Sequence, residues 1–290
     1  MRFATWILDG TETAGILAAD MKSVHSFTSV GLACRDMLDF IAGHTEADLN
    51  DLRAREGKDG TSIDRVRLTA PIPRPPHNVL CLGLNYRDHV EESFRAKNKE
   101  VKLRANTVYF SKFVSRALGA GEDIPSHADL TSQLDYEAEL GVVIGRTAHK
   151  VREEDAFAHV FGLMCLNDVS ARDLQSAHGQ WFLGKSLDGF TVYGPWITSM
   201  DSFELPLRLS VRSRVNGEER QHGNTSAMIC TIEQSIAELS AAMALSPGTI
   251  IASGTPGGVG MGFTPPRYMK PGDVCEIEID GCGILRNTVK

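Results

Sequence analysis

Hydrophobic and polar positions along the chain fall into short runs that are typical of β-strands. Apolar runs of strand length occur at 3–8, 79–84, 108–110, 140–144, 161–166, 207–215, 249–252 and 274–279. Helical patterns occur at 170–175 and 232–244. Because strands dominate and no regular strand–helix–strand repeat emerges, we expect an α+β, β-rich fold with a large mixed or antiparallel sheet system.

The first 70 residues have the pattern of a small α/β unit of their own. The turn Asp9-Gly10 between segments 3–8 and 11–18 predicts a hairpin, and helical patterns follow at 32–41 and 47–55, with Gly43 closing the first. Segment 71–77 carries four of the chain's twelve prolines, which predicts a stiff extended linker. We therefore expect an N-terminal domain (1–70), a proline-rich linker (71–77) and a larger domain (78–290).

One predicted strand carries two acidic residues that point the same way. Glu137 and Glu139 stand two residues apart at the start of the apolar run, and alternate strand residues share a face. Burying two like charges costs several kcal/mol or more unless a cation compensates them, and Mg²⁺ and Ca²⁺ prefer oxygen ligands. A solvated strand face is the alternative for an arbitrary Glu-x-Glu pair.

A third carboxylate ends the next long apolar strand. Segment 161–166 leads directly to Asn167-Asp168. Three carboxylates from two strands can hold a divalent cation and leave coordination positions for water and substrate. We therefore predict a metal site formed by Glu137, Glu139 and Asp168.

A candidate base follows the first strand of the larger domain. If a helix begins near Asn85, His89 and Glu92 are three positions apart and can touch, so that the carboxylate orients the imidazole for proton transfer. An exposed histidine with an ordinary ion pair explains the same spacing. The charged segment 91–104 behind the pair is consistent with either a solvated loop or a lid.

Polar residues after Asp168 are candidate substrate contacts. On a helix that starts there, Arg172 and Gln175 share a face beside the predicted metal, although a surface helix carries such residues too. Residues 179–186 formally match the phosphate loop G-x-x-x-x-G-K-[ST], but Trp181-Phe182-Leu183 fills the loop and no buried strand precedes it. We reject a nucleotide site and keep Lys185 as a lone cation beside an apolar patch.

A glycine-dense loop follows the predicted strand 249–252. Residues 253–260 read Ser-Gly-Thr-Pro-Gly-Gly-Val-Gly, which permits close backbone approach to a small anion, with Thr255 offering a hydroxyl. A purely structural turn is an equal alternative, because the loop lacks the spacing of a dinucleotide site.

Composition limits the partners. The net charge is −7 with no basic block, which argues against nucleic acid, and no apolar run approaches the roughly 20 residues of a membrane helix. No signal-peptide layout is present, and six scattered cysteines lack C-x-x-C spacing, so we expect free thiols and a cytoplasmic location.

Taken together, these segments resemble the fumarylacetoacetate hydrolase family from about Val79 to the C-terminus. The motifs that carry the resemblance are Leu84-Asn85-Tyr86-x-x-His89, Tyr109-Phe110-Ser111-Lys112, Leu134-Asp135-Tyr136-Glu137-x-Glu139-Leu140, Asn167-Asp168-x-Ser170-x-Arg172-Asp173-x-Gln175, Gly184-Lys185-Ser186, Gly194-Pro195-Trp196 and Ser253-Gly254-Thr255-Pro256-x-Gly258-Val259-Gly260. Prolines expected between the His–Glu pair and Tyr109 are missing, so the motifs do not determine the geometry of the lid or the choice of substrate.

The resemblance implies a β-rich roll fold, a homodimer, and an Mg²⁺ or Mn²⁺ ion, with Ca²⁺ as an alternative. It also implies roles for individual residues. Glu137, Glu139 and Asp168 would be the metal ligands, His89 and Glu92 the catalytic pair, Arg172, Gln175 and Lys185 polar groups that face the substrate, and Thr255 part of the loop that holds the substrate carboxylate. In the mechanism that we expect from these charges, Lys185 stabilises the oxyanion.

The expected activity is hydrolysis of a C–C bond in an acylpyruvate-type 2,4-dioxo acid through a metal-stabilised enolate. His89 would activate water for that reaction. Decarboxylation of a 2-oxo acid such as oxaloacetate, and isomerisation or hydration of related acids, share the enolate and stay open. A non-catalytic ligand-binding protein is a weaker alternative, because no predicted ligand or base is lost.

Overall fold

A computed structural model describes residues 1–55, 60–96, 100–101 and 105–290. Within these residues eleven strands form one large sheet. Its order is β4 (Thr61–Ser62), β3 (Ser23–Ser26), β2 (Thr11–Leu17), β1 (Arg2–Leu8), β12 (Thr191–Ser199), β10 (Val160–Asp168), β9 (Ala138–Ile144), β15 (Ile250–Ala252), β6 (Val79–Gly83) and β7 (Val108–Lys112), with β5 (Arg67–Thr69) paired to β1. Most neighbours are antiparallel, whereas β6 and β15 are parallel, so the mixed, β-rich fold expected from the sequence is confirmed.

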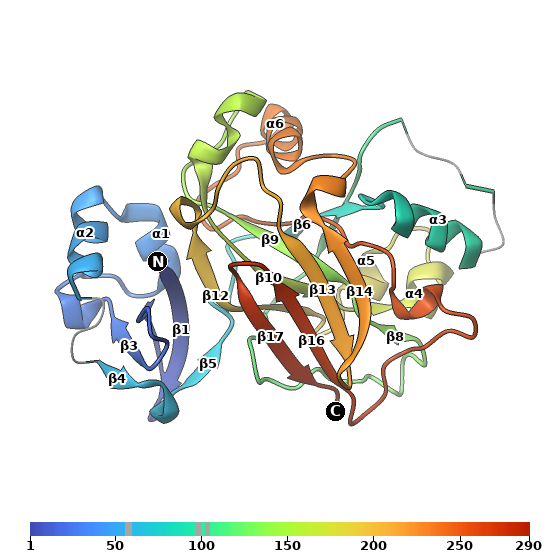
Figure 1. Cartoon of the computed structure of the whole chain (residues 1–290), viewed down its shortest axis with the longest axis horizontal. Coiled ribbons are helices and arrows are strands. Elements are labelled where there is room, and N and C mark those ends of the chain that lie inside the picture. The colour runs from blue at the N-terminus through green and yellow to red at the C-terminus, as the bar shows by residue number, and fades with distance from the viewer. Residues whose placement is uncertain (56–59, 97–99, 102–104) are drawn as a thin grey trace.

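A second sheet covers one face of the large one. It consists of β14 (Glu218–Asn224), β13 (Ser210–Val215), β16 (Val274–Ile279) and β17 (Gly283–Thr288), which lie together in front of β9 and β10 in Figure 1. Val142 and Cys165 belong to the same hydrophobic core as Val211 and Ile277 of this second sheet. The next residue along β9, Val143, belongs to the opposite core, as strand alternation requires.

The helices lie around the two sheets (Figure 1). They are α1 (Met37–Gly43), α2 (Glu46–Arg55), α3 (Arg87–Ala96), α4 (Arg172–Ala177), α5 (Phe182–Lys185) and α6 (Ile232–Ala242). The short pair β8 (Leu134–Asp135) and β11 (Ser170–Ala171) lies beside α4. None of the described helices is long and apolar enough to cross a bilayer.

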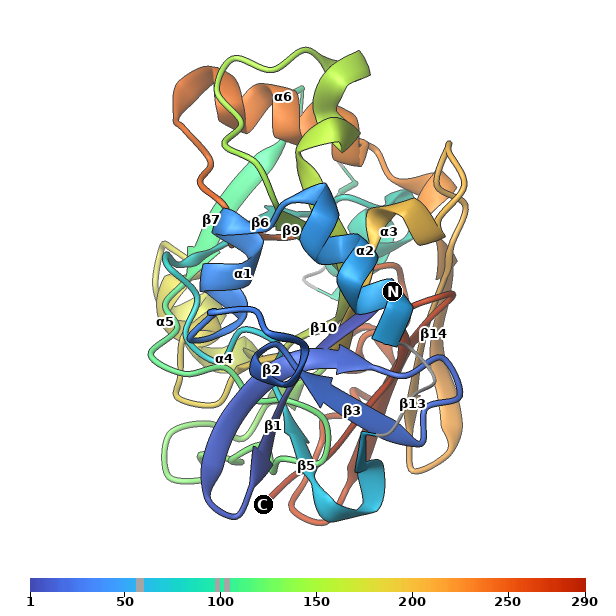
Figure 2. The ribbon, with the colours of Figure 1, turned by 90° about the vertical axis from the view of Figure 1, so that its left-hand side faces the viewer.

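The N-terminal segment forms the predicted hairpin and helices, and its elements face the viewer in Figure 2. The first helix begins later than expected, at Met37, because Asp36 caps it by accepting the Asp39 backbone N–H. Strand β1 pairs with β12, and Phe3 and Phe40 pack against Phe161 of β10, so this segment shares both the sheet and a core with the rest of the chain. The division at residues 71–77 stays a prediction.

The proline-rich segment is packed onto the body. Ile72 is buried, its carbonyl accepts from the Tyr193 hydroxyl at 2.6 Å, and the Pro71 carbonyl accepts from the Thr5 hydroxyl at 2.6 Å. Residues 91–96 are the second half of α3 and not a loop, because Val90 and Ser93 give that helix a buried side. The remainder of the predicted lid falls largely on 97–99 and 102–104, which lie outside the described residues.

Candidate active site

Three carboxylates converge because of the register of two central strands. Glu139 lies opposite Leu166, and the Asp168 backbone N–H donates to the Glu137 carbonyl at 3.0 Å. Glu137, Glu139 and Asp168 therefore project from one face, away from the second sheet. One ligand atom from each lies within 4.8 Å of the others, and all three side chains are buried. The residues predicted as metal ligands thus form one cluster.

Three cations surround this cluster. Lys185 Nζ donates to Glu137 Oε2 at 2.6 Å and to Asp168 Oδ2 at 2.7 Å. Lys112 Nζ pairs with the other Asp168 oxygen and donates to the Val169 carbonyl at 3.0 Å. Arg172 Nη1 pairs with Glu137 Oε1 at 2.7 Å. Each of these pairs is almost fully shielded from solvent, so it binds its carboxylate strongly.

Glu139 is the member of the triad that forms no ion pair with any of the described residues. It accepts the Gly254 backbone N–H at 2.8 Å. Burial, and then repulsion from Asp168 and Glu137, raise the pKa of Glu139 well above its usual value. At Glu137 burial acts in the same sense, but Lys185 and Arg172 outweigh it and lower the pKa of that carboxyl.

The donor set fits a hard divalent cation. With Asp135, the cluster holds four carboxyl groups against the three cations Lys112, Arg172 and Lys185, and Glu139 is the carboxyl group that none of these three contacts. Closely spaced carboxylate oxygens are the ligands that Mg²⁺, Mn²⁺ and Ca²⁺ prefer. A divalent cation would relieve the repulsion that Glu139 experiences.

The predicted base pair lies on α3. His89 Nδ1 is 3.5 Å from Glu92 Oε2, and His89 Nε2 is 3.5 Å from the Ser93 hydroxyl. Both separations are at the long end for hydrogen bonds. Glu92 also accepts the Gly258 backbone N–H at 3.0 Å, which anchors the carboxylate to the glycine-dense loop.

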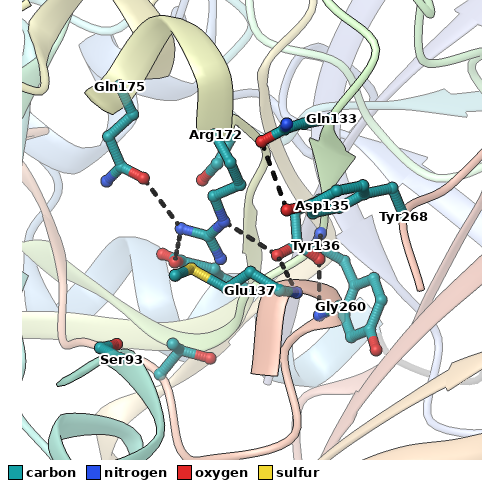
Figure 3. Close-up of polar contacts among 12 residues, drawn as sticks. Ser93, Gln133, Asp135, Tyr136, Glu137, Arg172, Gln175, Gly260 and Tyr268 are labelled. Atoms are coloured by element: carbon teal, nitrogen blue, oxygen red, sulfur yellow. Dashed lines mark hydrogen bonds and ion pairs between the residues drawn. The ribbon is translucent and has the colours of Figure 1, made fainter. Parts of the chain in front are cut away.

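Arg172 begins α4, and Gln175 lies one turn further along the same helix, as Figure 3 shows. Arg172 Nη1 donates to Gln175 Oε1 at 3.2 Å, and Arg172 Nε donates to Asp135 Oδ2 at 2.8 Å. Arg172 Nη2 is buried without a hydrogen-bond partner among the described residues. An unsatisfied buried guanidinium nitrogen is costly, and an anionic ligand would satisfy it.

These groups line one cavity of about 280 Å³. Its lining comprises His89, Ser93, Glu137, Glu139, Arg172, Gln175, Lys185, Thr255 and Met261, together with an apolar part that includes Leu82, Phe94, Phe110 and Trp181. Asp168 lies beneath, fully buried. The volume is just below the range of about 300–1,000 Å³ found for drug-sized ligands, so the cavity suits a small acid.

The predicted site residues therefore lie together, but the Thr255 hydroxyl is already hydrogen-bonded within the protein. The Thr255 hydroxyl donates to the Ala138 carbonyl at 2.9 Å and accepts from Gln221 Nε2 at 2.7 Å. Its bonds brace the loop against β9, and a contact with substrate stays a prediction. Residues 179–186, which formally match a phosphate loop, comprise part of the connection between α4 and α5 and the short helix α5 itself. Lys185 at the end of α5 binds carboxylates.

Two residues at the site were missed from the sequence. Lys112 ends an apolar strand, and a fully buried lysine in such a run signals a buried acidic partner. Asp135 begins the acidic stretch that contains Glu137, but its partner Arg172 is 37 residues away, so only the fold reveals the pair.

Comparisons with known proteins agree with this geometry. The family "Fumarylacetoacetate (FAA) hydrolase C-terminal" matches residues 78–290. The oxaloacetate tautomerase YisK of Bacillus subtilis is 46% identical over 228 residues, which are 79% of this chain and 74% of that protein.

Two solved structures are similar over the whole chain. A fumarylacetoacetate hydrolase from Exiguobacterium antarcticum is 39% identical with a TM-score of 0.84, covering 100% of this chain and 99% of that one. A maleylpyruvate hydrolase from Sphingobium is 28% identical with a TM-score of 0.80 and the same coverage. The chain therefore belongs to the fumarylacetoacetate hydrolase family, whose relatives named here are enzymes.

Proposed function

We propose that this chain is a divalent-metal-dependent enzyme that interconverts the keto and enol forms of a small 2-oxo dicarboxylic acid, with oxaloacetate as the first candidate. The observation that carries the proposal is one small cavity that is lined by Glu137, Glu139, His89 and Arg172 and lies above the buried Asp168. Among the described residues, Arg172 Nη2 has no hydrogen-bond partner there. The 46% identity to an oxaloacetate tautomerase supports the choice of substrate.

Glu137, Glu139 and Asp168 would hold the ion, with Mg²⁺ first and Mn²⁺ or Ca²⁺ as alternatives. A divalent cation bound there supplies a Lewis acid that polarises the 2-oxo group and stabilises the enolate charge. Lys185, already bonded to Glu137 and Asp168, would keep these two carboxylates in place and add positive charge beside the developing oxyanion.

Arg172 would bind a carboxylate of the substrate. Its Nη2 has no hydrogen-bond partner among the residues that the structure describes, and Nη1 and Nε are held by Glu137, Gln175 and Asp135. A guanidinium whose other nitrogens are fixed loses little entropy when it binds an anion, which favours affinity.

His89 would move the proton. In its neutral form the imidazole takes a proton from C3 of the oxo acid, the C–H electron pair forms the C2–C3 double bond, and the 2-oxygen becomes an enolate. The imidazolium then returns the proton to that oxygen, which gives the enol with no change in composition. Glu92 would stabilise the imidazolium, since its carboxylate is fixed by the Gly258 N–H.

C–C bond hydrolysis of an acylpyruvate, expected from the sequence, is the second candidate. It is favoured by the same His89–Glu92 pair, which could instead take a proton from water, and by the likeness to a maleylpyruvate hydrolase. Decarboxylation of oxaloacetate needs the same enolate and no water activation, so it is the third outcome to be measured.

A substrate panel tests the proposal. The protein is supplied with Mg²⁺ and either oxaloacetate or an acylpyruvate, and the keto–enol ratio, carbon dioxide and carboxylic acid products are followed separately. The proposal expects accelerated keto–enol exchange of oxaloacetate without carbon loss. Hydrolysis products or carbon dioxide as the dominant result would replace it with the second or third candidate, and no turnover of any substrate would favour a non-catalytic binding protein.

We also propose a homodimer, as the resemblance to the family implied, and a cytoplasmic location. Sedimentation velocity of the purified chain tests the first, and a species at the monomer mass of 31.6 kDa across the accessible concentration range would contradict it.

A further inference from the structure

Asp135 is a fully buried carboxylate that does not line the cavity. Its two oxygens accept from four donors. Asp135 Oδ2 accepts from Arg172 Nε at 2.8 Å and from the Met261 backbone N–H at 3.0 Å, and Asp135 Oδ1 accepts from the Gly260 N–H at 2.7 Å and the Tyr136 N–H at 3.0 Å. Figure 3 shows this convergence beside Arg172.

We propose that Asp135 is a positioning residue that fixes both Arg172 and the loop 258–262 as one wall of the active site. The expected effect on ligand binding rests on the proposed function, whereas the contacts of Asp135 do not depend on it. Asp135 acts through other groups, because no atom of it faces the cavity.

The effect on Arg172 follows from how its nitrogens are distributed. Asp135 holds Nε, and Glu137 and Gln175 hold Nη1, so two of the three guanidinium nitrogens have fixed partners. Nη2 is then the guanidinium nitrogen that no described residue binds, and it can bind a ligand. Without the bond at Nε, the guanidinium could rotate so that Nη2 turns towards Glu137, and the donor for an anionic ligand would be lost.

The effect on the loop follows from its close approach. A Cβ on Gly260 would overlap Asp135 Oδ1 and the Arg267 carbonyl, so the backbone comes as near to the carboxylate as glycine allows. The next residue, Met261, lines the cavity. Gly258, two residues before Gly260, donates to Glu92, the partner of His89.

Asp135 therefore connects the two sides of the site. Its oxygens reach Arg172 on one side, and on the other side the loop that it holds supports the carboxylate of the base pair. Carboxylates that accept several backbone N–H bonds and one guanidinium bond are strongly held, so this connection is rigid.

The first test needs no substrate. Hydrogen–deuterium exchange is measured over residues 258–267 in wild type, Asp135→Asn and the control Asp173→Asn. Asp173 neighbours Arg172 on α4 but binds the Thr131 hydroxyl and the Ser132 N–H. We expect amide exchange in this loop to rise at least about tenfold in Asp135→Asn, because two acceptors of its N–H groups are weakened, and to stay unchanged in Asp173→Asn. Unchanged exchange in Asp135→Asn would overturn the proposal.

The second test uses oxalate, a planar dicarboxylate, titrated calorimetrically in the presence of Mn²⁺. We expect Asp135→Asn to bind Mn²⁺ as wild type does and oxalate about tenfold or more weakly. In an Arg172→Lys background, which lacks the fork that Asp135 holds, Asp135→Asn should weaken oxalate binding by less than about twofold. Equal weakening in both backgrounds would overturn the action through Arg172.

The two arms separate the possible failures. If wild type binds no oxalate with Mn²⁺, the proposed function fails, and the exchange experiment alone decides the role of Asp135. If Asp135→Asn does not fold, Gly260→Ala disturbs the same contact from the loop side, since its Cβ overlaps Asp135 Oδ1. The same rise in exchange and loss of oxalate affinity is expected there, and wild-type values would contradict the proposal.

Discussion

Asp168 donates its backbone N–H to the Glu137 carbonyl at 3.0 Å, which places the last residue of β10 opposite the residue that precedes β9. Residues that lie opposite in neighbouring strands share a face. Their carboxylates are therefore forced together, and Lys185 bridges them. Glu139, two residues along the same face, pairs with no cation in the part of the chain that the structure describes, and this asymmetry leads to the first prediction.

Glu139→Gln should separate metal binding from stability. The substitution removes the carboxylate that is repelled by Asp168 and Glu137, so the metal-free protein should unfold at the same or a higher temperature than wild type. Mn²⁺ affinity should fall at least about tenfold, because one of three charged ligands is lost. Calorimetric titration and thermal unfolding of the same samples measure both, and unchanged Mn²⁺ affinity would remove Glu139 from the ligand set.

His89→Asn should remove proton transfer and leave the metal site intact. His89 lies on α3, whereas the triad lies on β9, β10 and the residue before β9. Losing a general base costs typically about 10²–10⁴-fold in rate, so kcat should fall in that range while Mn²⁺ affinity stays within error. The exposed His149→Asn serves as the control, with wild-type kcat expected. A His89→Asn variant with wild-type kcat would assign the base elsewhere.

Gly262→Ala should affect the base through Glu92. A Cβ at this position would overlap the Glu92 carboxylate, so the carboxylate must leave its place beside His89 and the Gly258 N–H. We expect kcat to fall about tenfold or more with little change in metal affinity. Gly43→Ala, where a Cβ meets nothing within 4 Å, is the matched control. Equal kinetics of the two variants would show that the position of Glu92 does not matter.

Stability at the junction of the N-terminal segment should depend on pH through Glu122. This buried carboxylate accepts the Thr69 hydroxyl at 2.9 Å, the Gly119 N–H at 2.8 Å and Arg116 Nη2 at 2.9 Å. Burial alone would raise the pKa of Glu122, but these hydrogen bonds outweigh it and lower the pKa. The stabilisation is therefore present above the unfolded-state value of about 4.3 and is lost as pH falls through the lower folded-state pKa.

Glu122→Gln should accordingly cost about 1–3 kcal/mol in the free energy of unfolding at pH 7. The difference from wild type should shrink once the pH drops below about 4, because wild type then loses the charged acceptor as well. Urea unfolding at both pH values measures this, with the exposed Glu204→Gln as the control. A cost that is the same at both pH values would contradict a charge-based role.

The parts of the fold and of the candidate site that the sequence predicted are those formed by residues close together in the chain. The triad was predictable because strand alternation places Glu137 and Glu139 on one face, and because an apolar run predicts the strand that ends at Asp168. The His89–Glu92 pair could be predicted for the same reason, because residues three positions apart on a helix are neighbours. Local patterns therefore sufficed for the residues that line the cavity.

Contacts between distant segments could not be read in this way. The pairing of β1 with β12, the bond between Asp135 and Arg172, and the placement of Lys112 beneath Asp168 each join residues far apart in the chain. The hydrophobic pattern predicts which face of a strand a residue occupies, but it does not predict which segment packs on that face. The helical character of 91–96 was missed for a related reason, because charged residues cover its outer side.

The central claim, that the triad serves a divalent cation needed for chemistry on a 2-oxo acid, is tested most directly by metal depletion and readdition. Keto–enol exchange of oxaloacetate is followed in chelator-treated protein while Mg²⁺ is titrated back. We expect the rate of the depleted protein to equal that of buffer and to recover as one ion binds per chain, with no recovery in Glu139→Gln at the same Mg²⁺ concentration. A full rate in the depleted wild-type protein would contradict the account.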